Sequence, residues 1–216
     1  MEDEEDTPGP PSDAATRRWG RIHEVLAVVV LSVTAILTAW CGFEASKWGG
    51  QMSIQFSQAS SARIQSIDFA SEARDVQAID LTIYELWLQA RADDDAAFAD
   101  YIQQRFTPEF AVAFAAWQAG GEQLRSPFAE PSYVVAGSAE AAAASARADD
   151  LFQSALVSNQ RGDDYTLLTV MFALVLFFVA ISERMRARWS RWFLLGLGMA
   201  IAVGGATILA TFPILV

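Results

Sequence analysis

The sequence predicts an all-α protein: three transmembrane helices and an extracytoplasmic helical hairpin or bundle. Three observations predict this fold: three long apolar runs, their spacing along the chain, and helical periodicity between the first two. Hydrophobic residues make up 53% of the 216 residues, yet the formal net charge is −11. Such a chain must keep its charged and apolar residues in separate segments.

The apolar runs cover residues 25–43, 166–181 and 193–216 and contain no charged side chain. A membrane-spanning helix needs about 20 predominantly apolar residues, within a range of about 17–25. The second run is at the short limit, but it is dense in Leu, Val and Phe. The first run exceeds the apolar core of about 7–15 residues in a signal peptide, so we expect it to remain as an anchor.

Basic residues near the ends of the runs predict the orientation. They are Arg17, Arg18 and Arg21 before the first run, and Arg184, Arg186, Arg188 and Arg191 between the second and third. Residues 44–164 instead carry eight basic and eighteen acidic residues. Because cytoplasmic loops are enriched in Lys and Arg, the N-terminus is predicted to be cytoplasmic, and residues 44–164 and the C-terminus extracytoplasmic.

The predicted organisation has six parts. They are a disordered acidic cytoplasmic tail (1–21), transmembrane helix 1 (22–43), an extracytoplasmic α-helical domain (44–164), transmembrane helix 2 (165–182), a cytoplasmic Arg-rich loop (183–191) and transmembrane helix 3 (192–216).

Two long helices are predicted to continue from spans 1 and 2 into the extracytoplasmic domain, with two short helices between them. Residues 51–92 contain no Pro or Gly and carry an apolar stripe at helical spacing. Thr107 and Pro108 predict an N-cap followed by proline at the first helical position. A returning helix is predicted to begin at Ser138. Whether Gly49-Gly50 and Gly162 break the long helices stays open.

Composition excludes several functions. The acidity argues against a nucleic-acid partner, because binding phosphates needs a basic face. One Cys and one His in the whole chain exclude Cys-only and multi-His metal sites. No catalytic constellation is visible, so we expect no enzyme, no cofactor and no metal. Proton and ion paths usually need ionisable residues inside the spans, which these apolar runs lack.

The exit from the first span is the most distinctive segment. Trp40 and Trp48 fit an interfacial aromatic belt. Glu44 and Lys47 are three residues apart and are expected to pair on the helix surface. The segment predicts either a membrane-interface anchor with a soft joint at Gly49-Gly50, or a docking site for a membrane protein or lipid headgroup.

A small-residue row in the third span is the other candidate interface. Gly196, Ala200 and Gly204 recur every fourth residue and share one helix face. Small residues let helices approach closely in lipid. We expect this row, or a second one through Gly198 and Ala202, to pack against the first span or a partner subunit.

Residues 39–66, 80–87 and 161–186 resemble a group of small uncharacterised bacterial membrane proteins. Those proteins have three spans and one extracytoplasmic helical loop domain. The resemblance implies a multi-pass protein of the bacterial inner or plasma membrane, and it carries over no catalytic or binding residue.

The predicted function is that of a non-enzymatic accessory or scaffold protein that acts through protein contacts. Its expected partners are the lipid bilayer and either another membrane protein or further copies of itself. The alternative is an extracytoplasmic sensor that signals through a partner subunit, since this chain offers no output domain of its own.

Overall fold

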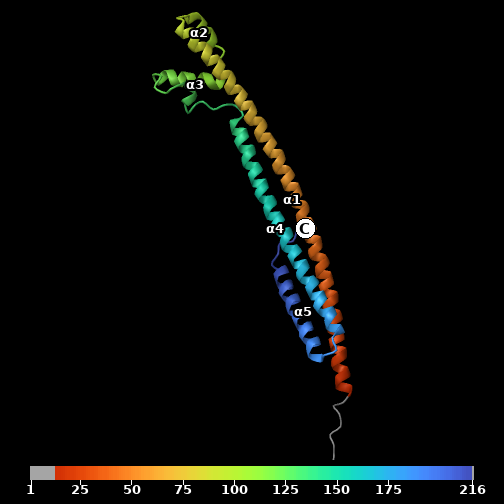
Figure 1. The fold of residues 1–216 in the computed structure, drawn as a ribbon. Coiled ribbons are helices and arrows are strands. Elements are labelled where there is room, and N and C mark those ends of the chain that lie inside the picture. Colours follow the sequence, from red (N-terminus) through yellow and green to blue (C-terminus); the bar gives the residue numbers. More distant parts are fainter. Residues whose placement is uncertain (1–12, 216) are drawn as a thin grey trace, which may run out of the picture. The chain divides into compact units, whose positions relative to one another are not determined.

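The structure, a computed structural model, describes the backbone of residues 13–215 and the side chains of residues 18–215. Its elements are α1 (Asp13–Ala92), α2 (Ala96–Gln103), α3 (Pro108–Ala119), a 3₁₀ turn η1 (Pro127–Ala129), α4 (Ser138–Arg184) and α5 (Arg188–Leu209), as Figure 1 shows. No strand occurs among these described residues. Three of the helices (α1, α4 and α5) are long and apolar enough to cross a membrane. The all-α prediction with three apolar helices is therefore confirmed.

The chain divides into two compact units. Unit 1 comprises residues 1–53 and 156–216, and unit 2 comprises residues 54–155. Both α1 and α4 contribute residues to each unit.

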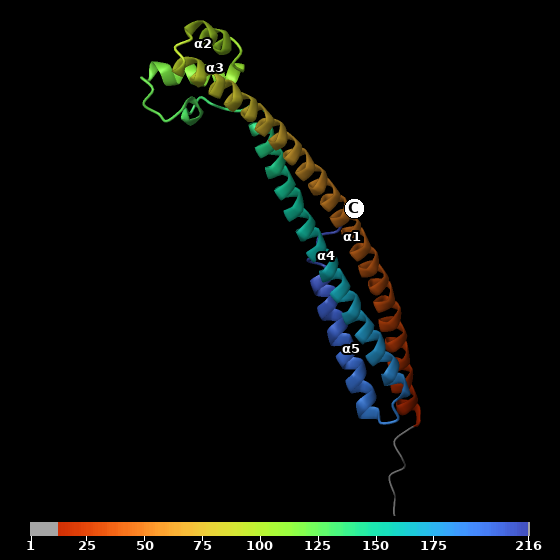
Figure 2. The same cartoon turned by 45° about the horizontal axis from the view of Figure 1, so that its top comes forward.

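In unit 2, α1 and α4 lie side by side (Figure 2) and are joined by polar contacts. The hydroxyl of Ser66 donates to the carbonyl of Ala141 at 2.9 Å. Arg63 binds the carboxylate of Asp149, but both side chains are largely exposed. Exposed ion pairs contribute little, about 0–1 kcal/mol, so the apolar contacts between the helices matter more.

An aromatic core holds α2 and α3 against the last turns of α1. Its buried residues are Tyr84, Trp87, Ala90, Ala99, Ile102, Phe106, Phe110, Phe114 and Trp117. Phe110 is 0% and Phe114 is 1% exposed, so the centre of this core is closed to solvent. The two short helices pack near the distal part of α1, as expected because the outgoing helix is longer than the returning one.

Local sequence signals set the ends of the short helices. The side chain of Asp95 accepts from the Phe98 N–H at the start of α2, and Thr107 accepts from the Phe110 N–H at the start of α3. Such caps satisfy backbone donors that lack an intrahelical partner. α3 ends before Gly120, as predicted, and Gly121 adopts a left-handed φ of 70° that suits glycine.

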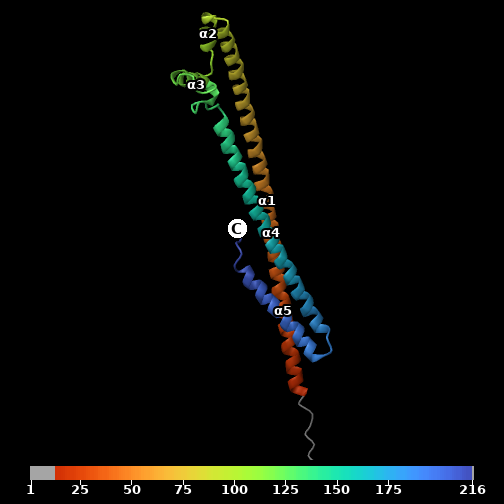
Figure 3. The same ribbon diagram turned by 60° about the vertical axis from the view of Figure 1, so that its left-hand side comes forward.

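In unit 1, α5 packs beside α4 and α1, as Figure 3 shows. One buried cluster contains Ala27, Val175, Val179 and Leu195, and a second contains Cys41, Tyr165, Leu168 and Phe172. Cys41 is fully buried there and packs as a small apolar residue.

Several predicted boundaries are wrong. Residues 13–21, predicted to be disordered, belong to the helix α1, and the Trp19 ring packs edge-on against Trp192 at 6.2 Å between ring centroids. Residues 1–12 of the predicted tail lie outside the described residues. The Arg-rich loop reduces to residues 185–187, since α4 and α5 extend into it. The third helix ends at Leu209 and not at residue 216, and Pro213, which lacks the N–H that a helix interior needs, follows soon after this end.

The sequence did not decide whether glycines break the two long helices. In the structure both helices are continuous through these glycines. Gly49-Gly50 lies within α1 and Gly162 within α4. A Cβ on Gly162 would lie 3.6 Å from the Ala45 carbonyl and 3.9 Å from the Gly49 nitrogen. The expected soft joint is therefore an unbroken helix, and small residues here let the backbones of α1 and α4 approach closely.

Candidate functional site

The predicted interface segment on α1 presents its side chains in different directions. Trp40 is 41% exposed and packs against the ring of Phe43, which suits contact with lipid headgroups. Trp48 is half-buried, and its indole N–H has no partner in the part of the chain that is described. Glu44 is only 1% exposed. The structure therefore leaves Trp40 accessible and turns Glu44 into the interior.

Glu44 and Lys47 bind a segment of their own chain. The Leu215 N–H donates to the Glu44 carboxylate at 3.1 Å, and the Lys47 ammonium donates to the Leu215 carbonyl. No ion pair joins Glu44 and Lys47 to each other among the described residues, contrary to expectation. The reason is that both side chains reach the backbone of the segment that follows α5.

Tyr165 on α4 completes this arrangement, which we name the Leu215 site: Glu44, Lys47, Tyr165 and the backbone of Pro213 and Leu215. The Tyr165 hydroxyl donates to the Pro213 carbonyl at 3.0 Å, and its ring packs against Phe212. Three side chains from two helices thus fix residues 210–215. The segment predicted to dock a partner is occupied, on this face, by the chain itself.

The two small-residue rows of α5, one through Gly196 and the other through Gly198, lie on opposite faces of the helix. A Cβ added to Gly196 or Gly204 would meet nothing within 4 Å in the described chain, and Ala200 is exposed. By contrast, a Cβ on Gly198 would lie 3.0 Å from Val179, and one on Gly205 would lie 2.9 Å from the Phe172 ring. Gly198 and Gly205 therefore form the contact with α4. A Cβ at Gly196 or Gly204 therefore does not reach the first span within the described chain, contrary to the expectation that this row packs against that span.

We expect Gly205→Leu to lower the free energy of unfolding by about 1–3 kcal/mol, because the larger side chain must displace the Phe172 ring. Gly204→Leu is the matched control, since its side chain enters open space. Unfolding of each purified variant by titration with denaturing detergent measures the effect. Equal loss in both variants would contradict the assignment of the two helix faces.

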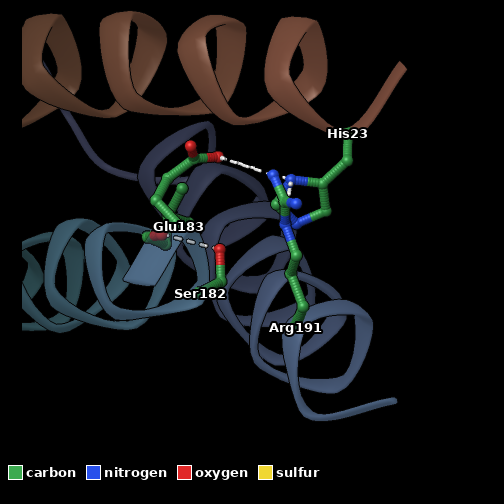
Figure 4. Close-up of polar contacts among 5 residues, drawn as sticks. His23, Ser182, Glu183 and Arg191 are labelled. Atoms are coloured by element: carbon green, nitrogen blue, oxygen red, sulfur yellow. Dashed lines mark hydrogen bonds and ion pairs between the residues drawn. The ribbon is translucent and has the colours of Figure 1, made fainter. Parts of the chain in front are cut away.

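A second polar cluster joins α1, α4 and α5 at their other ends, away from the Leu215 site (Figure 4). His23 on α1 is 1% exposed, and its Nδ1 lies 3.3 Å from the Glu183 carboxylate of α4. Arg191 on α5 donates from Nε to His23 Nδ1 at 3.1 Å, and it lies 3.9 Å from the same carboxylate. Sequence reasoning missed this cluster, because one histidine before an apolar run gives no signal of its partners.

Beside this cluster lies a cavity of about 220 Å³. Residues that line it include Trp19, His23, Arg186, Arg188, Arg191 and Trp192. The ring of Trp192 packs edge-on against His23 at 5.2 Å between centroids. A group of tryptophans and arginines at the end of apolar helices is typical of a membrane–water interface.

Asp80 is the buried carboxylate of unit 2, at 1% exposure. It accepts hydrogen bonds from the Thr107 hydroxyl at 2.7 Å and from the Tyr133 hydroxyl at 3.0 Å. Burial first, and then the hydrogen bond to Asp80, raises the pKa of Tyr133 above its ordinary value. Asp80 therefore ties α1 to the N-cap of α3 and to the segment before α4.

Among the described residues, no group of three or more His, Cys, Asp or Glu side chains is arranged to hold a metal ion. No family model, curated protein or solved structure matches the chain. The resemblance to small bacterial three-span membrane proteins stays a prediction. Inferences about function therefore rest on the contacts and cavities of this chain.

Proposed function

We propose that the chain is a non-enzymatic accessory or scaffold protein of a bacterial cell membrane, acting through contacts with a membrane-protein partner or further copies of itself. The observation that carries this proposal is the outward row of α5. Gly196 and Gly204 have open space beside them in the described chain. In lipid, such small residues favour association because they let another helix backbone approach.

The buried polar side chains support a scaffold over an enzyme. Asp80 is engaged by Thr107 and Tyr133, and Glu44 by the backbone of Leu215. Each carboxylate accepts hydrogen bonds from its own chain and lies almost fully out of solvent. A buried polar group that is satisfied in this way stabilises structure. These contacts are what a rigid interaction module requires.

The proposed orientation places residues 44–164 outside the cytoplasm and the short connection between α4 and α5 inside. Arg184, Arg186 and Arg188 at this connection supply the basic residues that favour the cytoplasmic side. We expect a reporter inserted at residues 185–187 to give a cytoplasmic signal, and one inserted at Gly121 to give an extracytoplasmic signal. A cytoplasmic signal at Gly121 would overturn this orientation.

Purification from native membranes tests the scaffold proposal. We expect the parent chain to be recovered as a complex of defined size in mild detergent, with a partner or as an oligomer. Gly204→Leu with Ala200→Leu should reduce that complex while leaving insertion intact, because Leu favours lipid and blocks close approach. Val203→Leu, which enlarges an exposed position on the same helix, is the matched control. A complex unchanged by the double substitution would exclude this face as the interface.

The sensor alternative gains support from a cavity of about 490 Å³ in unit 2, lined by residues that include Phe56, Arg63 and Phe152 of α1 and α4. Helices lining such a cavity can respond to a ligand if it binds two arrangements unequally. A sensor predicts that a small molecule raises the melting temperature of the parent protein and not of an Arg63→Ala variant. A scaffold predicts a partner complex with no such ligand.

A further inference from the structure

The cavity beside His23 has an excess of positive charge. Arg186, Arg188 and Arg191 all line it. Within the described chain only Arg191 has an acidic neighbour, at 3.9 Å from Glu183, and no ion pair is found there for Arg186 or Arg188. Two guanidinium groups are thus available to an anion beside a cavity of about 220 Å³. Guanidinium matches phosphate geometry because it donates two parallel hydrogen bonds.

The start of α5 adds backbone donors at the same place. α5 begins at Arg188, and its N-cap residue Ala187 makes no side-chain hydrogen bond to the helix. The first N–H groups of a helix lack intrahelical acceptors, and the helix dipole favours negative charge there. Arg188, the first residue of α5, also lines the cavity.

His23 supplies an independent observation. Its Nδ1 lies 3.1 Å from Arg191 Nε and 3.3 Å from the Glu183 carboxylate, so this nitrogen is engaged by its own chain. Nε2 is buried and has no partner in the described chain, although His23 is 1% exposed and lines the cavity. A buried polar nitrogen without a partner is destabilising. A polar ligand group at this cavity would provide the missing partner.

We propose that this cavity binds a phosphate group, as presented by the headgroup of an anionic phospholipid. Arg186 and Arg188 would hold the phosphate oxygens, while Arg191 is positioned by His23 and Glu183. Trp19 and Trp192 line the same cavity and place it at the depth of lipid headgroups. The proposal requires these helices to span a membrane, but it does not depend on the scaffold function.

Native mass spectrometry of the full chain in a neutral detergent tests the site, with phosphatidylglycerol and phosphatidylcholine as probes. Arg186→Gln with Arg188→Gln removes the two unpaired guanidinium groups. Arg21→Gln with Arg184→Gln is the matched control, because it removes the same charge near the same helix ends from residues that do not line the cavity. Equal melting temperatures of the variants verify that folding is intact.

We expect the parent chain to retain phosphatidylglycerol in preference to phosphatidylcholine. The cavity variant should bind it at least about tenfold more weakly, the loss expected when a hydrogen bond to a charged group is removed, while the control keeps its affinity. Inorganic phosphate at matched ionic strength identifies the source of the ligand. Displacement of the lipid assigns the site to free phosphate, and no displacement assigns it to the headgroup. Equal loss in both variants, or no preference between the two lipids, would overturn the proposal.

Discussion

Replacing Trp117 by alanine is expected to lower the free energy of unfolding of unit 2 by about 3–5 kcal/mol. Trp117 is 6% exposed, and its ring contacts Phe114 and Tyr84 in the aromatic core. Its indole N–H also donates to the Leu124 carbonyl at 2.8 Å. The substitution therefore leaves both a large cavity and a carbonyl without its donor, next to the end of α3.

Pulse proteolysis of the full chain measures this loss. Trp117→Phe keeps much of the ring packing but removes the hydrogen bond to Leu124, so a loss smaller than that of Trp117→Ala is expected. Val112→Ala on the same helix is the control, because Val112 is 60% exposed and an exposed substitution usually changes stability by no more than about 0.5 kcal/mol. If Trp117→Ala resists protease as well as the Val112 variant does, Trp117 is not part of a stabilising core.

The parts of this fold that sequence predicts are those controlled by neighbouring residues. The apolar runs indicate three helices because a span needs a fixed length of apolar chain. Thr107 and Pro108 indicate the start of α3 because a cap and a proline act within one turn. The stripe of Val76, Ile79, Ile83 and Leu86 predicts the core face only in part: Ile83 packs against the aromatic cluster, but Ile79 is 53% and Leu86 is 40% exposed.

Contacts between distant residues are not predictable in this way. Glu44 and Leu215 are separated by 171 positions, so no local spacing signals their hydrogen bond. On α5, the rows through Gly196 and Gly198 have the same spacing, and only the position of α4 decides which row is buried. His23 meets Arg191 because three helix ends converge, which depends on tertiary packing.

The second large effect is expected at the Leu215 site. Glu44→Ala should lower the free energy of opening of residues 210–215 by about 1.5–3 kcal/mol, the usual contribution of a hydrogen bond to a charged group. The Leu215 N–H then loses its acceptor. Hydrogen exchange of the peptide that covers these residues measures the opening. Glu24→Ala, at an exposed position of the same helix, is the control.

A graded series distinguishes the charge of Glu44 from its hydrogen bond. Glu44→Gln keeps an oxygen acceptor for Leu215 and should cost less than Glu44→Ala. Lys47→Met removes the donor to the Leu215 carbonyl and keeps the apolar stem of the side chain. Because both side chains bind the same residue, their effects should not add: once Leu215 is released, the second contact is already lost. Strict additivity in the double variant Glu44→Ala with Lys47→Met would show that the two side chains stabilise this segment independently.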